Sequence, residues 1–324
     1  MKKLIIFLII TFSLLFYGLK KLTVVNLSNP VVIEVEKGDS LKTISKKLQK
    51  TGIIKDWRIF YIYSLLKGET LRYGFYEFSG NPSIFKVWQT LYTGKEKLIS
   101  VTITAGNDLI DIAQKLQNAG LIKKETFLKY VFNQKNVQKF GLKGESFEGY
   151  FPPETYFFRK GETVENIVKT FLQEFKRKYS SYISIAEKKG IDFYKLMKIA
   201  SLVEKETFID EEKPIIAGVI NNRLKKRMHL QIDPTVIYAL KLEKKWSGHL
   251  NRQDMKIKSP YNTYLNYGLP PTPIGNFSIT SLEASIFFRK TAFLYYVFDG
   301  KKHLFSKTYR EHIKNINKIK KDKK

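Results

Sequence analysis

Two glutamates stand two positions apart in the segment "SLVEKET" (201–207), and glutamate is one of the side chains that perform general acid catalysis. The surrounding residues 192–207 have the apolar spacing of an amphipathic helix. At about 100° per residue, Glu206 lies about 20° from Ile199, inside the apolar stripe, whereas Glu204 lies about 140° away from it. The pattern therefore predicts that Glu206 faces the interior and that Glu204 does not.

A carboxyl group on a buried helix face is costly unless it is paired or protonated, and burial raises its pKa toward the value that a general acid needs. The helix dipole also disfavours an anion at a helix C-terminus. A second interpretation is that the helix ends before Glu206 and leaves the residue solvated. Since the two glutamates point about 160° apart, they cannot flank one glycosidic bond as the paired carboxylates of ordinary glycosidases do.

The composition bounds the class of protein. The 324 residues, 43% hydrophobic and 14% aromatic, are enough for a buried core and about two domains. The net charge of +27 comes from 48 Lys and only 9 Arg, and base readout favours the planar Arg side chain, so we expect no nucleic-acid partner. The chain has no Cys, and it shows no metal-ligand spacing and no cofactor motif, so we expect neither a metal nor a cofactor.

The N-terminus begins with an apolar run without a charge, Leu4 to Leu19, between two lysine pairs. No small-residue cleavage site follows, which favours an uncleaved membrane anchor over a signal peptide. We therefore expect a single-pass protein of the cell (inner) membrane that contacts the bilayer through residues 4–19. The remainder would lie on the periplasmic or extracellular side, and charges at the two ends of the run favour this orientation only weakly.

The chain contains an internal repeat, because residues 32–56 align with 100–124 at an offset of 68. Each copy is predicted to form a strand, a glycine turn and an amphipathic helix that ends at a glycine. The motif "GDSLKTISKKL" resembles the opening of LysM modules, which bind N-acetylglucosamine polymers. A plain α+β packing unit used twice explains the repeat equally well.

The remaining pattern completes the expected organisation. Residues 71–97 are predicted to form a strand and a helix that ends at Gly94, and helices are expected at 125–139 and 162–190. We expect an α+β fold with four parts: a membrane anchor helix (1–22), a LysM-like α+β domain (23–98), a mixed α/β catalytic domain (99–312) that includes the second repeat copy (99–125), and a basic tail (313–324).

Four motifs occur in series: "ASLVEKET", "HLQIDPTVIYAL", "SPYNTYLNYGLPPTPIGN" and "DGKKHLFSKTYREH". Their order and spacing resemble the endolytic murein transglycosylase family (MltG, YceG-like), and the resemblance covers almost the whole chain. It implies a lytic transglycosylase whose acid is the glutamate directly before a hydroxyl residue, which here is Glu206 before Thr207. It also implies peptidoglycan glycan strands as substrate and partnership with peptidoglycan synthases.

A sugar cleft needs amides, carboxylates and aromatic rings. The motifs supply these groups, and the candidate substrate-binding residues are Glu148, Gln231, Asp233, Tyr261, Asn262 and Tyr264. Asp233, which precedes Pro234, could instead cap a helix, and Asn262 could hold a turn. His303, Glu311 and His312 match the C-terminal motif of the family, and we expect them to be structural.

We therefore expect a membrane-anchored enzyme that cleaves the MurNAc–GlcNAc β-1,4 bond of nascent strands with a single glutamate acid/base and leaves a 1,6-anhydro-MurNAc end. Two alternatives stay open. One is a non-catalytic scaffold that binds peptidoglycan through the repeated units, and the other is a muramidase that uses water.

Overall fold

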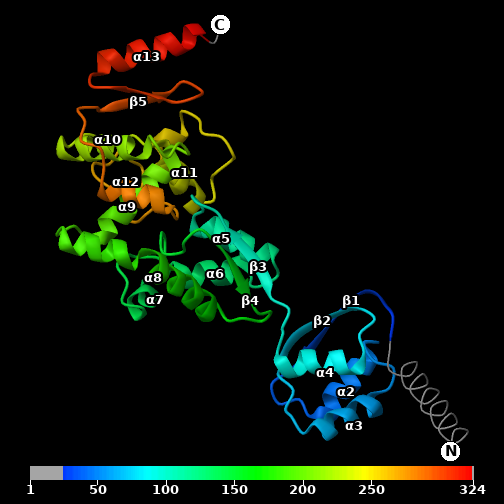
Figure 1. The fold of residues 1–324 in the computed structure, drawn as a ribbon. Coiled ribbons are helices and arrows are strands. Elements are labelled where there is room, and N and C mark those ends of the chain that lie inside the picture. The colour runs from blue at the N-terminus through cyan, green and yellow to red at the C-terminus, as the bar shows by residue number, and fades with distance from the viewer. Residues whose placement is uncertain (1–24, 323–324) are drawn as a thin grey trace, which may run out of the picture. The chain divides into compact units, whose positions relative to one another are not determined.

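Residues 25–322 are described in the computed structural model of the chain (Figure 1). The chain divides into two compact units: unit 1 is the chain up to Ile99 with Phe157–Gly161, and unit 2 is Ser100–Tyr156 with Glu162–Lys324. Both contain helices and small two-stranded sheets, so the expected α+β class is observed. The anchor expected over 1–22 lies outside the described residues, and within 25–322 we find no helix with the length and apolarity to cross a bilayer.

Unit 1 is built on one antiparallel strand pair, in which Ile33 lies opposite Tyr76. Its elements are β1 (Leu27–Val35), α2 (Leu41–Lys50), α3 (Trp57–Lys67), β2 (Gly74–Gly80) and α4 (Ile84–Thr93). Each helix starts where the side chain of Ser40, Asp56 or Ser83 accepts a backbone N–H hydrogen bond, as N-cap residues do. The apolar faces of these elements enclose one core, which includes the fully buried Leu48, Phe60 and Leu91.

The segment Phe157–Gly161 joins unit 1 although it lies far along the chain. Arg159 Nε is 3.3 Å from Glu96 Oε2, and the Glu96 side chain is nearly buried. The Lys160 ammonium lies 5.4 Å from the ring centroid of Phe75 on β2. Unit 1 is therefore assembled from two separate stretches of sequence.

Both repeat copies have the predicted strand, glycine turn and helix. The turn glycines Gly38 and Gly106 have φ values of 97° and 80°, a backbone region in which a Cβ atom is unfavourable. In the second copy, Asp108 and Asp111 form a capping box at the start of the helix.

Unit 2 is largely helical and contains two further strand pairs. Its elements are β3 (Ile99–Ile103), α5 (Leu109–Asn118), α6 (Lys124–Val131), α7 (Gln134–Lys139), β4 (Glu154–Phe158), α8 (Val164–Lys188), α9 (Phe193–Glu206), α10 (Lys213–Lys225), α11 (Asp233–Leu242), the 3₁₀ turn η1 (Asp254–Lys256), α12 (Ile279–Ile286), β5 (Tyr295–Phe298), β6 (His303–Ser306) and α13 (Tyr309–Asp322). The predicted helix 125–139 is interrupted, because the Asn133 side chain accepts the Lys135 N–H and starts a new helix.

Helix α9 lies at the centre of the C-terminal half of unit 2, in contact with α10, α11 and α12. Its apolar residues Ile199, Leu202 and Val203 pack in one cluster with Ile216 and Ile220 of α10. This packing fixes the end of α9, where Glu206 lies, on several neighbouring elements.

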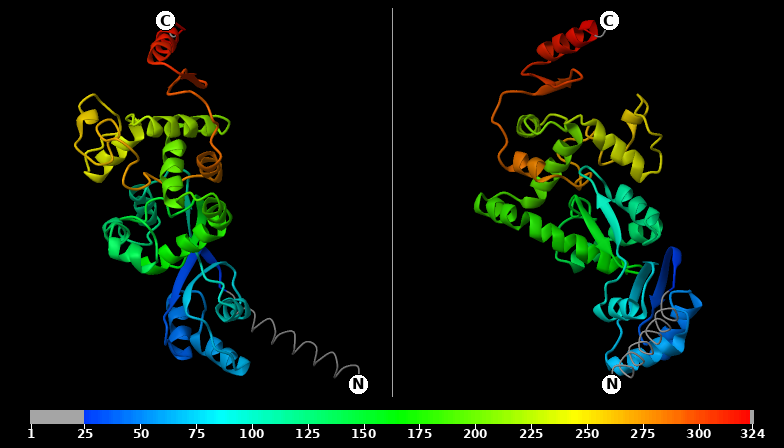
Figure 2. Two further views of the ribbon diagram at one scale, coloured as in Figure 1. Left: turned by 90° about the vertical axis from the view of Figure 1, so that its left-hand side faces the viewer. Right: turned by 45° about the vertical axis from the view of Figure 1, so that its right-hand side comes forward.

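Strands β5 and β6 form a hairpin that packs on α13 at the C-terminal end of unit 2 (Figure 2). The Asp299 side chain accepts the N–H groups of Lys301 and Lys302 at 2.7 and 2.9 Å, and Gly300 has a φ of 105°. An Asp side chain that accepts backbone N–H groups and a glycine with positive φ are typical of a tight hairpin turn.

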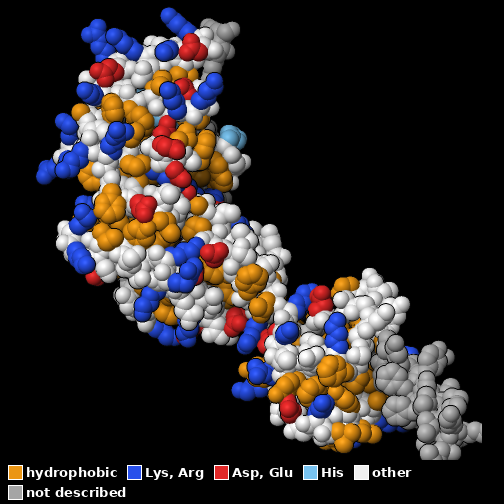
Figure 3. Space-filling view, in the orientation of Figure 1, with side chains coloured by type: hydrophobic (Ala, Val, Ile, Leu, Met, Phe, Trp, Pro, Cys, Tyr) orange, Lys and Arg blue, Asp and Glu red, His pale blue; other side chains and the backbone are white. Residues whose placement is uncertain are grey.

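Lysine and arginine side chains are scattered over the visible face of the molecule (Figure 3). They alternate with acidic and apolar side chains and do not gather into one patch on this face.

Candidate active site

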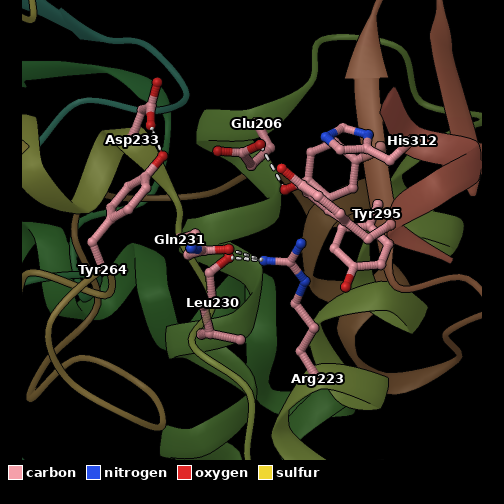
Figure 4. A pocket seen from close by; sticks show the side chains of 10 residues that line it. Glu206, Arg223, Leu230, Gln231, Asp233, Tyr264, Tyr295 and His312 are labelled. Atoms are coloured by element: carbon pink, nitrogen blue, oxygen red, sulfur yellow. Dashed lines mark hydrogen bonds between the residues drawn. The ribbon is translucent and has the colours of Figure 1, made fainter. Parts of the chain in front are cut away.

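The Glu206 side chain lines a polar cavity of about 330 Å³ within unit 2 (Figure 4). The ends of α9 and α10, the segment that leads into α11, the loop around residue 264, β5 and the first turn of α13 all contribute to it. The lining residues are Glu206, Arg223, Leu230, Gln231, Asp233, Tyr264, Tyr295, Tyr296, Tyr309 and His312. The cavity therefore combines two carboxyl groups, one guanidinium, one imidazole, one amide and four phenols.

Helix α9 places the Glu206 carboxyl at its last residue. The helix begins at the Asp192 cap and ends because Thr207 adopts an extended conformation, with φ of −148°. The Thr207 hydroxyl accepts the N–H of Ile209, which turns the chain away from the helix axis. Glu206 is therefore held by a rigid helix but is not covered by a following turn, so its side chain reaches the cavity.

The Glu206 carboxyl is half-buried, and the Tyr296 hydroxyl donates to its Oε2 atom at 2.7 Å. Burial raises the pKa of Glu206 to about 7, and the neighbouring Asp233 acts in the same direction. The Tyr296 hydrogen bond and the Arg223 charge oppose this shift in pKa. A carboxyl group with a pKa near neutrality can both give and take a proton at physiological pH.

Glu204 lies on another side of α9 and is not solvated, in contrast to the expectation that it faces away from the protein. Its Oε2 accepts hydrogen bonds from the Ser278 N–H at 2.9 Å, the Ser278 hydroxyl at 2.5 Å and the Ser281 hydroxyl at 2.6 Å. Lys213 Nζ lies 3.7 Å away. Since Ser278 is the N-cap of α12, Glu204 ties α9 to the start of that helix.

Gln231, Asp233 and Tyr264 line the cavity together with Glu206, and these are four of the seven predicted site residues. Asp233 is the first residue of α11 and not its cap, and its Oδ1 accepts a 2.5 Å hydrogen bond from the Tyr264 hydroxyl. Gln231 has a φ of 52°, a left-handed conformation that is uncommon for a residue with a side chain. Its N–H donates to the Thr263 carbonyl, which holds this conformation in place.

Glu148 does not line the cavity. Its side chain is fully buried, and Oε2 accepts hydrogen bonds from the Leu109 N–H at 3.2 Å and the Tyr238 hydroxyl at 2.7 Å. Burial, with a further contribution from Asp108, raises the pKa of Glu148 to about 8. This carboxyl group joins the second repeat copy to α11 and has no access to a substrate in the cavity.

Asn262 and Tyr261 also lie outside the cavity lining. The Asn262 amide donates to the carbonyls of Met255 and Ile257, both at 2.9 Å, while its Oδ1 accepts the Tyr264 N–H. The Tyr261 hydroxyl is hydrogen-bonded to Thr272, and its ring packs edge-on against Tyr238. Both residues fix the loop that carries Tyr264, which agrees with the turn interpretation of Asn262.

The cavity includes residues that the sequence did not point to, among them Arg223, Tyr295 and Tyr296. His312, expected to be structural, also lines it and stacks on Tyr295 at 5.4 Å between ring centroids. Burial and the charge of Arg223 lower the pKa of His312. The sequence "FDGKKHLF" between aromatic residues carries the Asp-Gly signal of a hairpin and could have placed Tyr296 and His303 on paired strands.

His303 holds this hairpin to the end of α9. Its N–H donates to Glu212 Oε1 at 2.8 Å, and its Nδ1 lies 2.5 Å from Glu212 Oε2. Glu212 also accepts a 3.4 Å hydrogen bond from the Thr207 hydroxyl, next to Glu206. Glu311 accepts the N–H groups of Lys307 and Thr308 at the start of α13. His303 and Glu311 are thus placed as structural residues.

The chain is similar in sequence to proteins of one known family. The model of the YceG-like family matches residues 33–318. The proteins named endolytic murein transglycosylase from Bacillus subtilis (strain 168) and Streptococcus pneumoniae serotype 2 (strain D39 / NCTC 7466) are 33% and 31% identical to this chain. Each alignment covers 88% of this chain, and the two cover 83% and 58% of the respective relatives.

A solved structure is also similar. The crystal structure of a yceG-like protein from Listeria monocytogenes matches with a TM-score of 0.62 and 30% sequence identity. The match covers 88% of this chain and 98% of that chain, so the likeness extends over both units.

Proposed function

Because this chain belongs to the YceG-like family, we propose that it is a lytic transglycosylase that acts on peptidoglycan. The bond cleaved is the β-1,4 bond between MurNAc and GlcNAc inside nascent glycan strands, and the product is a 1,6-anhydro-MurNAc end. The observation that carries the proposal is Glu206: a half-buried carboxyl group with a pKa of about 7 at the wall of a polar cavity. The names of two relatives support the substrate class.

Glu206 performs two proton transfers in this reaction. In its protonated form it donates to the glycosidic oxygen, and the bond between that oxygen and C1 of MurNAc breaks. The resulting carboxylate accepts the proton of the C6 hydroxyl of the same sugar, whose oxygen forms the new bond to C1. Glu206 ends protonated, as it began, and no water is consumed.

A muramidase that uses water is the second candidate, because Asp233 supplies a second carboxyl group in the same cavity. Two carboxyl groups across a sugar are the arrangement of ordinary glycosidases. The Asp233 carboxylate already accepts a hydrogen bond from Tyr264, so we assign it to substrate binding. The two reactions differ in their products, since the muramidase product is one water heavier.

We also propose the location of the enzyme. The apolar run of residues 4–19 would hold it in the cell membrane, with the two units on the outer side, where newly made strands emerge. Close to the membrane it would act beside the peptidoglycan synthases. Unit 1 would keep a LysM-like role in holding the strand.

The test is a digest of purified glycan strands followed by mass analysis of the products. The wild type is expected to release anhydro-muropeptides, and Glu206→Gln is expected to lose at least about 100-fold in rate while it keeps its melting temperature. Glu211→Gln, an exposed position five residues later, is the matched control. Unchanged release by Glu206→Gln would refute the assignment of the acid. Saturable binding without any new chain ends would favour the non-catalytic scaffold.

A further inference from the structure

Arg223 presents one unused hydrogen-bond donor to the cavity. Its guanidinium is almost fully buried, yet only two of its three nitrogens are engaged. Nε donates to the Leu294 carbonyl at 2.6 Å, and Nη1 donates to the Leu230 carbonyl at 2.7 Å and more weakly to the His229 carbonyl and the Gln231 side chain. Nη2 makes no hydrogen bond to any residue in the range 25–322, and Figure 4 shows the group directed into the cavity.

The position of this donor is fixed before any ligand arrives. The carbonyls that hold the guanidinium come from two segments, Leu294 directly before β5 and the residues before α11. The Tyr295 ring lies over it at 5.2 Å from the guanidinium carbon to the ring centroid. A planar guanidinium group held in this way loses little conformational freedom when it binds an oxygen atom.

No carboxyl group of the cavity pairs with Nη2. Asp233 accepts the Tyr264 hydroxyl and Glu206 accepts the Tyr296 hydroxyl, and within residues 25–322 neither forms a hydrogen bond or an ion pair with Arg223. A guanidinium N–H that faces a cavity pairs most strongly with a carboxylate or carbonyl oxygen. Nη2 is therefore available to such an oxygen on a ligand.

A peptidoglycan strand offers such an oxygen on every second sugar. MurNAc carries a lactyl ether at C3 that ends in a carboxyl group, either free or joined by an amide bond to the stem peptide, whereas GlcNAc has a hydroxyl there. We propose that Arg223 Nη2 binds the carbonyl oxygen of this lactyl group on the MurNAc unit whose glycosidic bond Glu206 protonates. This inference rests on the proposed function and assigns Arg223 as the residue that sets the cleavage register.

The register matters because the β-1,4 bonds of the strand alternate in kind. A shift of the strand by one sugar would place the bond from GlcNAc to MurNAc at Glu206, and the backbone of the strand would look nearly the same to the cavity. If Arg223 binds the lactyl group, a strand shifted by one sugar presents GlcNAc at this position and leaves Nη2 without an acceptor. A missing charge-assisted hydrogen bond of this kind corresponds to a loss of about 10- to 100-fold in kcat/KM.

The first arm of the test uses the wild-type protein and changes the substrate. Glycan strands freed of their peptides are compared with the same strands after the lactyl carboxyl has been reduced to a primary alcohol. We expect kcat/KM to fall at least 10-fold on the reduced strands and GlcNAc oligomers of matched length to inhibit weakly. Equal cleavage of both strands, or inhibition by GlcNAc oligomers as strong as by the muramyl strands, would overturn the proposal.

The second arm uses Arg223→Lys, which keeps the charge but cannot hold both carbonyls and reach the cavity. Its preference for native over reduced strands should disappear, with KM affected more than kcat, while the matched control Arg227→Lys, exposed four residues later, keeps the preference. A folded Arg223→Lys protein that still discriminates would overturn the proposal. If this variant does not fold, the substrate arm decides alone. Absence of anhydro products from every substrate would instead refute the proposed function itself.

Discussion

Glu204 and Glu206 lie two residues apart on α9 and have separate tasks: Glu204 Oε2 accepts the hydroxyls of Ser278 and Ser281, and Glu206 Oε2 accepts the hydroxyl of Tyr296 across the cavity. The first contact joins α9 to α12, and the second joins α9 to β5. The end of α9 thus carries one glutamate that joins two helices and one that the proposed mechanism uses as its acid, and substitutions can separate the two roles.

Glu204→Ala should lower the free energy of unfolding by about 2 kcal/mol, because it removes a buried acceptor of three hydrogen bonds and leaves the Ser278 N–H unpaired. Turnover per folded molecule should change little. Denaturant unfolding measures the loss, and Glu187→Ala, at an exposed position of α8, is the control. A stability equal to that of the wild type would contradict the role of Glu204 as a tie between helices.

The activity should fall as the pH rises through about 7. In the proposed mechanism the reaction starts from protonated Glu206, and burial raises the pKa of this group to about 7. The fraction of enzyme with protonated Glu206 therefore declines about tenfold for each pH unit above that value. A pH profile of kcat/KM on soluble glycan strands measures this limb, and constant activity up to pH 9 would rule out Glu206 as the group that titrates.

Tyr296→Phe should move that limb to higher pH. The Tyr296 hydroxyl stabilises the ionised carboxylate and so lowers the pKa of Glu206, and its removal lets burial act unopposed at this contact. The same profile serves as the measurement. Tyr295→Phe, which also lines the cavity but makes no hydrogen bond to Glu206, should leave the limb in place. A shift of equal size in both variants would argue against a specific contact.

Glu212→Ala should lower kcat/KM by about 10- to 100-fold although Glu212 does not line the cavity. It holds His303 of β6 and Thr207 beside Glu206, so its loss frees the hairpin that positions Tyr296. Misplacement of a catalytic contact by about 1 Å can cost this much. Amide hydrogen exchange in residues 295–306 should become faster, and Glu211→Ala, its exposed neighbour, should change neither quantity.

Glu148→Gln should keep its activity and gain stability at high pH. Burial raises the pKa of Glu148 from 4.5 to about 8, so its contribution to stability is complete below pH 4.5 and is lost as the pH rises through about 8. The amide has no proton to lose, so the free energy of unfolding of the variant should exceed that of the wild type by much more at pH 9 than at pH 5. Loss of glycan cleavage at pH 6 would show that Glu148 serves the site after all.

The sequence predicted the parts of the site that depend on local pattern. Helical periodicity located α9 and turned Glu206 toward the interior, because its apolar neighbours Ile199, Leu202 and Val203 pack as the period requires. The same reasoning misjudged Glu204, since the serines that bind it lie more than 70 residues away. Hydrophobic periodicity detects only the apolar side of a helix. It does not reveal a second buried side on which a polar residue contacts a polar partner.

Long-range contacts explain the other differences. Arg223 and His312 line the same cavity because Tyr295 of β5 contacts both, under the His312 ring and over the Arg223 guanidinium, and no local spacing encodes these contacts. Glu148 and Asn262 carry the side chains that a sugar site uses, yet each finds its partners in the surrounding protein. Residue type alone therefore could not separate the polar side chains that line the cavity from those that bond inside the protein.

The return of Phe157–Gly161 into unit 1 has a practical consequence for dissecting this protein into fragments. A truncated chain that stops near Ile99 would expose Glu96 and Phe75, whose partners Arg159 and Lys160 it would lack. If such an N-terminal fragment were unstable or failed to bind sugar polymers, the cause could be the missing segment 157–161. The result would not show that this region lacks a sugar-binding site. Carbohydrate affinity of this region is better measured in the intact chain, with the cavity disabled by a single substitution.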